Sequence, residues 1–236
     1  MQQYFVDTKL NVNDDVTLRS DIIYHLTKVL RSTNKTFRLV DINGDVFLCN
    51  LVDDKGKVID KLKENNELVI NITAIVSLIK QDKFELILQK LTELGVNKIV
   101  PFNAKRSVVK ETKGDKKLIR YKKILEEAAE QSHRNRIPQI TNAIDIKDVK
   151  DYMSDINLIA YEKEDSGVKS NLMGKSITFV IGPEGGFDED EFNKFKEFGF
   201  TSISLGKRIL RAETAAIYLT SIIVGENQWK HFLWWF

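Results

Sequence analysis

The chain has 236 residues, of which 42% are hydrophobic and 30% are charged, with 12 glycines and 3 prolines. These proportions exclude collagen-like, low-complexity and disordered chains, and the length suffices for one large domain or two smaller ones. The single cysteine, Cys49, excludes an internal disulfide, and three scattered histidines provide no zinc-ligand spacing. We therefore expect a cytoplasmic protein without a structural metal.

The net charge of +2 conceals an uneven distribution along the chain. Residues 71–140 carry 15 Lys and Arg against 8 Asp and Glu, whereas residues 1–70 have a net charge of −1 and residues 141–236 one of −4. A basic segment of this kind attracts RNA or DNA, and a solvated basic face is the alternative. Asp7 and Lys9 interrupt the N-terminal segment and no apolar run approaches ~20 residues, so we expect neither a signal peptide nor a membrane span.

Residues 1–70 are predicted to be mostly strand. One helix is expected over 20–31, where apolar residues recur at helical spacing behind a Ser20-Asp21 cap. A hairpin follows, with strands at 36–41 and 46–51 around Asn43-Gly44, which favours a type I′ turn. This part therefore predicts a small β-rich barrel or sandwich.

Beyond residue 70 the pattern changes to strands alternating with helices, which predicts a parallel sheet covered by helices. A helix ending at Gly95 and another that starts with a capping box at Asp188 and ends at Gly199 are its clearest members. The predicted segments are 69–79, 84–94, 98–102, 118–133, 156–161, 177–182, 188–198, 202–205 and 212–224.

Two segments place glycines and charges at the ends of predicted parallel strands, where open α/β sheets bind ligands. In the first, residues 179–187, an apolar strand runs into Gly182, Pro183, Gly185 and Gly186, so a ligand can approach the backbone with no Cβ in the way. Glu184 within this turn is expected to be buried. The glycine spacing matches neither the dinucleotide motif nor the P-loop.

The second segment, residues 204–216, leads from a strand end through a long loop into a helix. Arg211 stands just before that helix and is suited to hold an anion or to stabilise one that forms during a reaction. Glu213 lies in the first helical turn, where the helix dipole alone would explain a carboxylate. The sequence contains no Gly-x-Ser-x-Gly motif, and Cys49 is expected to be a buried residue of a hairpin strand, so hydrolase chemistry is disfavoured.

Several motifs together resemble those of the SPOUT-class, or α/β-knot, RNA methyltransferases, and within that class the ribosomal RNA small subunit methyltransferase E family. The resemblance spans nearly the whole chain. Its strongest part is Gly-Pro-Glu-Gly-Gly at 182–186, followed by Leu-Gly-x-Arg-Ile-Leu-Arg-x-Glu-Thr at 205–214. Further matching segments are His25-Leu26 with Val29-Leu30-Arg31, then 89–96, 105–107, 127–132 with Arg134, and 181–187.

The resemblance implies a PUA-like RNA-binding β-barrel at residues 1–70 and an α/β trefoil-knot methyltransferase domain with a parallel sheet at 71–236. It further implies a homodimer formed through the knot domain, S-adenosyl-L-methionine as cofactor, no metal and no membrane. The implied reaction is methylation of N3 of a uridine in 16S ribosomal RNA, free or within the 30S subunit. The residues implied to bind the cofactor are Tyr161, Glu162, Ile181, Gly182, Pro183, Glu184, Gly185, Gly186, Leu205, Gly206, Ile209, Leu210, Arg211 and Thr214.

For catalysis, we expect Arg211 to stabilise the anion left when the uridine imide loses its proton, with Glu213 ordering the loop or assisting proton removal. The residues expected to contact RNA are Arg19, His25, Arg31, Lys105, Arg106, Arg134 and Arg136. Members of the family usually begin with an arginine before the first aromatic pair. This chain has Gln3 there, which disfavours an RNA contact at that position.

Two other functions remain open from the sequence. One is a related knot enzyme that modifies another base or a ribose 2′-hydroxyl. The other is a noncatalytic RNA-binding dimer. Retention of Gly182, Gly185, Gly186 and Gly206 favours an enzyme, because each costs about 0.5–1 kcal/mol relative to Ala in an ordinary backbone conformation.

Overall fold

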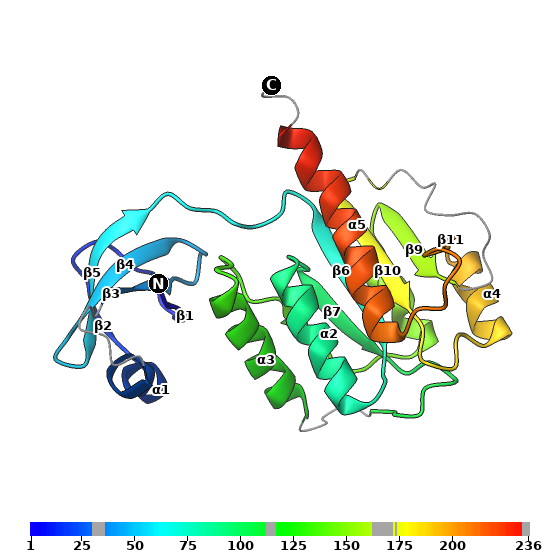
Figure 1. Cartoon of the computed structure of the whole chain (residues 1–236), viewed down its shortest axis with the longest axis horizontal. Coiled ribbons are helices and arrows are strands. Elements are labelled where there is room, and N and C mark those ends of the chain that lie inside the picture. Colours follow the sequence, from blue (N-terminus) through cyan, green and yellow to red (C-terminus); the bar gives the residue numbers. More distant parts are fainter. Residues whose placement is uncertain (30–35, 112–116, 162–171, 173, 233–236) are drawn as a thin grey trace. The chain divides into compact units, whose positions relative to one another are not determined.

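A computed structural model describes residues 1–29, 36–111, 117–161, 172 and 174–232 (Figure 1). The chain divides into two compact units. The first comprises Met1–Glu67 together with Ala129–Arg136, and the second comprises Leu68–Ala128 and Ile137–Phe236. The first unit is therefore discontinuous in sequence, whereas the sequence predicts a single domain boundary near residue 70.

The first unit contains a five-stranded sheet in the order β1-β3-β4-β5-β2. Its first pair, β1 and β3, is parallel and the remaining pairs are antiparallel. The bounds are β1 Gln3–Phe5, β2 Asp15–Thr17, β3 Thr36–Val40, β4 Val46–Val52 and β5 Lys55–Leu62. The predicted helix is present as α1 (Ser20–Tyr24), which continues into a π-helical turn, η1 (His25–Val29). Ile22 and Leu26 bury their side chains in the core beneath the sheet.

The β3–β4 hairpin confirms the predicted pairing, but the predicted turn type is wrong. Gly44 has a φ of +85°, whereas Asn43 is not among the described residues with positive φ. A type I′ turn needs positive φ at both central positions. The Asp41 carboxylate instead organises the loop by accepting the N–H groups of Asn43 at 2.8 Å and Asp45 at 3.0 Å.

The second unit is built on a six-stranded sheet in the order β11-β9-β10-β6-β7-β8, with every pair parallel. This confirms the predicted α/β class with a parallel sheet. The strands are β6 Asn71–Ser77, β7 Lys98–Phe102, β8 Gln139–Ile140, β9 Ile156–Ala160, β10 Ser176–Ile181 and β11 Thr201–Ile203. The two-residue β8 is too short to show a sequence pattern and was not expected.

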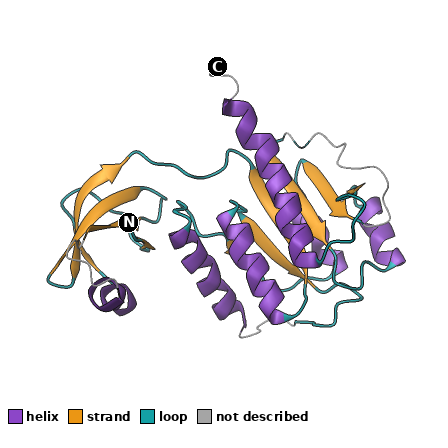
Figure 2. Cartoon of the chain, viewed as in Figure 1, coloured by secondary structure: helices purple, strands orange, loops and turns teal. Residues whose placement is uncertain are grey.

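Helices cover both faces of this sheet (Figure 2). One core lies between the sheet and the helices α2 (Gln81–Glu93), α3 (Lys117–Gln131) and α5 (Ala212–Phe232). The other lies beneath α4 (Glu189–Glu197) and the 3-10 helix η2 (Ile146–Tyr152). Alternate residues of β6 face the two cores, since Ala74 and Val76 join the first and Ile75 joins the second.

The C-terminal ends of two helices follow the expected capping residues. Gly95 after α2 has a φ of +92° and Gly199 after α4 one of +96°, which confirms both left-handed caps. Asp188 caps α4 by accepting the Asp190 N–H at 3.3 Å. The expected capping box is wrong, because the Glu191 carboxylate accepts the backbone N–H of Lys105 at 2.6 Å instead. The expected Ser20-Asp21 cap is also wrong, because Ser20 is already the first residue of α1 and the N-cap is Arg19, whose side chain makes no cap hydrogen bond.

Candidate active site

Three loops meet the same edge of the parallel sheet, because β9, β10 and β11 are parallel neighbours and each loop follows the carboxyl end of its strand. Tyr161 follows β9, the turn at 182–186 follows β10, and the loop at 204–211 follows β11. The two glycine-bearing segments singled out from the sequence are therefore brought to one edge. This is where open α/β sheets bind ligands.

The glycine turn after β10 packs on the core at one end and is exposed to solvent at Glu184 and Gly185. The Gly186 N–H donates to the Pro183 carbonyl at 2.9 Å, with Gly186 at a φ of +67°. A Cβ on Gly182 would come within 3.0 Å of the Phe187 ring, which is itself buried. Gly185 is exposed, and so is Glu184. The expected burial of Glu184 is wrong, because its position in the turn turns it outward from the core.

The loop after β11 combines backbone freedom with exposed side chains. Gly206 has a φ of +107°, and its N–H donates to the Ser204 hydroxyl at 3.3 Å. A Cβ on Gly206 would meet nothing within 4 Å. Ile209 is 90% exposed, whereas Leu205 and Leu210 pack partly against the core. The loop thus presents both open backbone and apolar surface.

The start of α5 carries the two residues proposed from the sequence for catalysis. The Arg211 carbonyl accepts the Ala215 N–H at 2.8 Å, which fixes the backbone at the helix start. Its side chain is exposed and has no ion-pair partner among the described residues. A Glu213 carboxylate oxygen lies 3.8 Å from the Lys83 ammonium nitrogen of α2. Thr214, the next residue, is exposed.

Tyr161 borders the same edge beside β11. Its ring stacks on Phe192 with centroids 3.9 Å apart and planes 17° from parallel. Its N–H donates to the Ile203 carbonyl at 3.0 Å. Glu162, the next residue implied to bind a cofactor, lies outside the described residues.

A fourth loop, after β7, brings Lys105 and Arg106 to the glycine turn. The Lys105 ammonium donates to Asp188 at 2.6 Å and to Asp190 at 3.2 Å. The hydrogen bond from Lys105 lowers the pKa of the Asp188 carboxyl, and the same contact raises the pKa of Lys105. Arg106 donates to the Gly185 carbonyl at 3.4 Å and remains about half exposed. Lys105 is thus paired within its own unit. Arg106, whose guanidinium also lies 3.8 Å from the Asp188 carboxylate, keeps about half of its side chain open to a ligand.

Known proteins similar to this chain show the family to which it belongs. The family model for an RNA methyltransferase domain matches residues 66–224. The "Ribosomal RNA small subunit methyltransferase E" of Mesomycoplasma hyopneumoniae is 36% identical over 93% of this chain and 97% of that protein. The protein of the same name from Bacillus subtilis is 36% identical over 97% and 98%. This chain belongs to the ribosomal RNA small subunit methyltransferase E family.

Membership of the methyltransferase E family confirms the resemblance predicted from the sequence. A structure from the family, the enzyme of Neisseria gonorrhoeae bound to S-adenosyl methionine, superimposes with a TM-score of 0.87. It is 31% identical to this chain, with 94% of this chain and 96% of that chain covered. The likeness therefore extends over both compact units.

Two residues predicted to contact RNA lie on or beside α1 in the first unit. The exposed Arg19 contacts the Asp21 carboxylate at 3.3 Å. The half-buried His25 is hydrogen-bonded through Nδ1 to the Tyr4 hydroxyl at 2.7 Å. Burial raises the pKa of Tyr4 to about 12, so the phenol keeps its proton. Arg31 lies outside the described residues.

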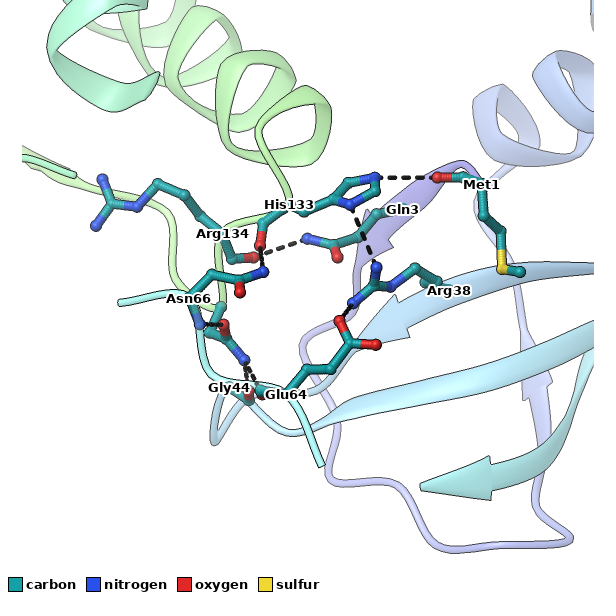
Figure 3. Close-up of polar contacts among 9 residues, drawn as sticks. Met1, Gln3, Arg38, Gly44, Glu64, Asn66, His133 and Arg134 are labelled. Carbon is teal, nitrogen blue, oxygen red and sulfur yellow. Dashed lines mark hydrogen bonds and ion pairs between the residues drawn. The ribbon is translucent and has the colours of Figure 1, made fainter. Parts of the chain in front are cut away.

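The segment after α3 is held by a polar network within the first unit, shown in Figure 3. The Arg134 carbonyl accepts a hydrogen bond from Gln3 at 2.7 Å, and the Arg134 guanidinium pairs with Glu67 at 2.6 Å. His133 accepts a hydrogen bond from Arg38 at 3.2 Å through Nδ1 and donates to the Met1 carbonyl at 3.1 Å. Arginine can only donate, which defines this tautomer.

The predicted RNA contact of Arg134 does not match this placement. Its side chain is only 4% exposed and its guanidinium is taken up by Glu67. Gln3 is 1% exposed and serves the same anchor through its side-chain amide, so its role is structural. Arg136 is exposed, as an RNA contact requires. The sequence could not separate the two arginines, because their burial depends on partners far along the chain.

No helix in the described part of the chain is long and apolar enough to cross a bilayer. No group of three or more His, Cys, Asp or Glu side chains in this part of the chain could hold a metal ion.

Proposed function

We propose that this chain transfers a methyl group from S-adenosyl-L-methionine to N3 of a uridine in 16S ribosomal RNA, in the cytoplasm. The observation that carries the proposal is the shared sheet edge, where the glycine turn at 182–186 and the loop at 204–211 both lie. Arg211 of that loop is exposed and has no ion-pair partner in the part of the chain that the structure describes. Membership of the methyltransferase E family supports the same conclusion. The cofactor-bound relative from Neisseria gonorrhoeae supports the choice of cofactor.

The residues at this edge fit the proposed cofactor. Ile209 and Leu210 offer apolar surface to an adenine ring. Gly185 and Gly206 leave the backbone open to hydrogen bonding, since a Cβ at Gly206 would meet only open space. The sulfonium cofactor would supply an electrophilic methyl group for in-line displacement. The residues proposed to hold it are those at 161–162, 181–186, 205–206, 209–211 and Thr214.

The chain's own part in the reaction is positioning and charge stabilisation. N3 lies on the Watson–Crick edge of uracil, so the target base must be unpaired or flipped out of its helix. Loss of the imide proton leaves negative charge on the ring, which the Arg211 guanidinium is suited to stabilise. Glu213 is paired with Lys83 and orders the start of α5, which in turn places Arg211.

The proposed function also implies identities for the two units and for the RNA contacts. The first compact unit, expected at residues 1–70 and found to include Ala129–Arg136, corresponds to a PUA-like RNA-binding domain. The second, expected at residues 71–236, corresponds to a trefoil-knot domain through which two copies dimerise. Arg19, His25, Arg106 and Arg136 are the described residues best placed to contact 16S RNA or the 30S subunit, with Lys105 held by Asp188.

The test combines calorimetric titration with S-adenosyl-L-methionine and methylation of 30S subunits that lack the modification. We expect about one cofactor per subunit, and 3-methyluridine in 16S RNA by mass spectrometry. Methylation of a ribose 2′-hydroxyl or of another base would replace the N3 assignment. A folded protein that binds RNA but no cofactor, with or without RNA present, would favour the noncatalytic dimer.

A further inference from the structure

Three buried side-chain atoms of the second unit have no hydrogen-bond partner among the described residues. They are Ser77 Oγ, Ser107 Oγ and Glu191 Oε2. Buried polar atoms in folded proteins are almost always hydrogen-bonded, so each such atom calls for an explanation.

All three lie at the carboxyl edge of the parallel sheet. Ser77 is the last residue of β6 and pairs with Phe102, the last residue of β7. Ser107 follows β7 by five residues. Glu191 is tied to the same loop, because its other carboxylate oxygen accepts the Lys105 N–H at 2.6 Å. The unpartnered atoms therefore gather beside the candidate active site.

The loop after β7 lies against the glycine turn. A Cβ on Gly185 would lie 3.5 Å from Arg106 Cβ and 3.7 Å from the Arg106 carbonyl oxygen. Ser107 is the next residue, and its N–H donates to the Ala104 carbonyl at 3.0 Å, so a tight turn fixes its backbone. A ligand that reaches Gly185 from this side meets the loop that carries Ser107.

Strand order separates two halves of this edge. The loops proposed to hold the cofactor follow β11, β9 and β10, whereas β6 and β7 continue the sheet on the other side of β10. A substrate placed beside the cofactor along this edge therefore lies over the ends of β6 and β7. Uracil presents two carbonyl oxygens there, which are acceptors for a hydroxyl donor.

We propose that Ser107 binds the target base, its hydroxyl donating a hydrogen bond to a carbonyl oxygen of uracil. The assignment rests on the proposed function. The hydroxyl oxygens of Ser107 and Ser77 are both covered in the free protein. Ser107 is favoured because it lies in a loop and its residue is 8% exposed, so a turn of its side chain can bring the hydroxyl to the base, whereas Ser77 ends a strand and is 0% exposed. Arg106 lies beside Ser107, and its half-exposed guanidinium, which also lies 3.8 Å from the Asp188 carboxylate, would face the neighbouring phosphates.

The first test compares Ser107→Ala with Ser221→Ala. Ser221 lies on α5, is exposed, and donates to the Ile217 carbonyl at 2.9 Å. Ser107→Ala should lower kcat/KM for the RNA about tenfold, because the uracil oxygen loses its partner in a desolvated site. Cofactor affinity should stay at the wild-type value. Thermal stability of the free protein should stay the same or rise, since the change removes a buried hydroxyl that lacks a partner.

The second test changes the substrate. RNA with 2-thiouridine or 4-thiouridine at the target replaces one carbonyl oxygen by sulfur, a weaker acceptor. The wild type should lose activity on one of the two RNAs, and Ser107→Ala should show no such difference from its own activity on uridine. A structural role for Ser107 would instead lower stability and leave the sulfur effect unchanged, which overturns the proposal.

The proposed function and the Ser107 assignment are refuted by different results. A wild type that binds no cofactor and methylates no RNA would refute the proposed function and this assignment with it. An active wild type with an equally active Ser107→Ala variant would refute the Ser107 assignment alone.

Discussion

The ammonium nitrogen of Lys83 lies 3.8 Å from a carboxylate oxygen of Glu213 and so links α2 to the first turn of α5. The Glu213 side chain is 12% exposed and that of Lys83 is 40% exposed. A pair this accessible contributes at most about 1 kcal/mol to folding. The pair therefore acts locally, by holding the start of α5 next to Arg211.

If Glu213 acts by holding the start of α5, breaking the pair from either side should have the same effect. We expect Glu213→Gln and Lys83→Met each to lower kcat by about three- to tenfold, with cofactor binding retained. Single-turnover methylation kinetics measure this. A loss of 100-fold or more in Glu213→Gln alone would instead identify Glu213 as the general base, within the range that such catalysis contributes.

Arg211 should contribute far more than the pair that positions it. Removing one preorganised group that faces developing charge costs about 10²–10³ in kcat. We expect a loss of this size in Arg211→Ala, with cofactor affinity by calorimetry within a few-fold of wild type. Arg208→Ala, which removes an exposed cation from the same loop, is the matched control. Near-normal turnover by Arg211→Ala would contradict the assigned role.

A substitution at Gly185 should change cofactor affinity without changing the stability of the fold. It is exposed, does not have positive φ, and an added Cβ would make only ordinary contact at 3.5 Å with Arg106. Gly185→Ala should therefore change the free energy of unfolding by less than about 0.5 kcal/mol. We expect a loss of at least about tenfold in cofactor affinity, because the methyl group takes the space of close backbone approach. Lys194→Ala on the exposed face of α4 should change neither quantity.

The Arg134–Glu67 pair should be important for the stability of the first unit. With side chains only 4% and 12% exposed, it resembles a buried ion pair, and removal of one partner from such a pair costs about 3 kcal/mol or more. Arg134→Met should therefore lower the denaturant midpoint of the first unit strongly. The control is Lys123→Met, which breaks the exposed Lys123–Glu127 pair and should cost under about 0.5 kcal/mol. Equal effects of the two variants would contradict the anchoring role.

Cys49 predicts a pH dependence in the first unit. Burial raises the pKa of its thiol from 9.0 to about 12. Between pH 9 and 12 the unfolded thiol loses its proton while the folded one keeps it, so the free energy of unfolding falls as pH rises. Cys49→Ala should make that decline shallower when unfolding is followed by denaturant titration at each pH. Tyr4, whose pKa is also raised to about 12, contributes to the slope in both proteins.

Local sequence pattern was sufficient to predict the helix ends and the parallel strand order. Gly95 and Gly199 were predicted as helix ends, and both adopt the expected left-handed conformation. The parallel strand order brought both glycine-bearing loops to one edge, as the alternation of strands and helices predicted. The family resemblance likewise depended on short, continuous motifs.

Predictions failed where the outcome depended on distant residues. Glu191 had the spacing of a capping box but bonds Lys105 in another loop. Arg134 was predicted to contact RNA but is buried against Glu67. The type I′ turn failed for a local reason instead, because the Asp41 carboxylate, two residues before Asn43, directs the loop into another conformation. The unpartnered hydroxyl of Ser107 had no sequence signal, because the absence of a partner is a property of the folded surroundings.

The discontinuity of the first unit bears on the order in which the chain folds as it is made. Residues 1–67 leave the ribosome first, but Gln3, Asn66 and Glu67 bond to residues 133–135, which emerge only after all of 68–128. The first unit therefore cannot complete its contacts during synthesis until α3 has been made. A gene fragment that stops at residue 70 would encode a sheet whose polar anchor is missing.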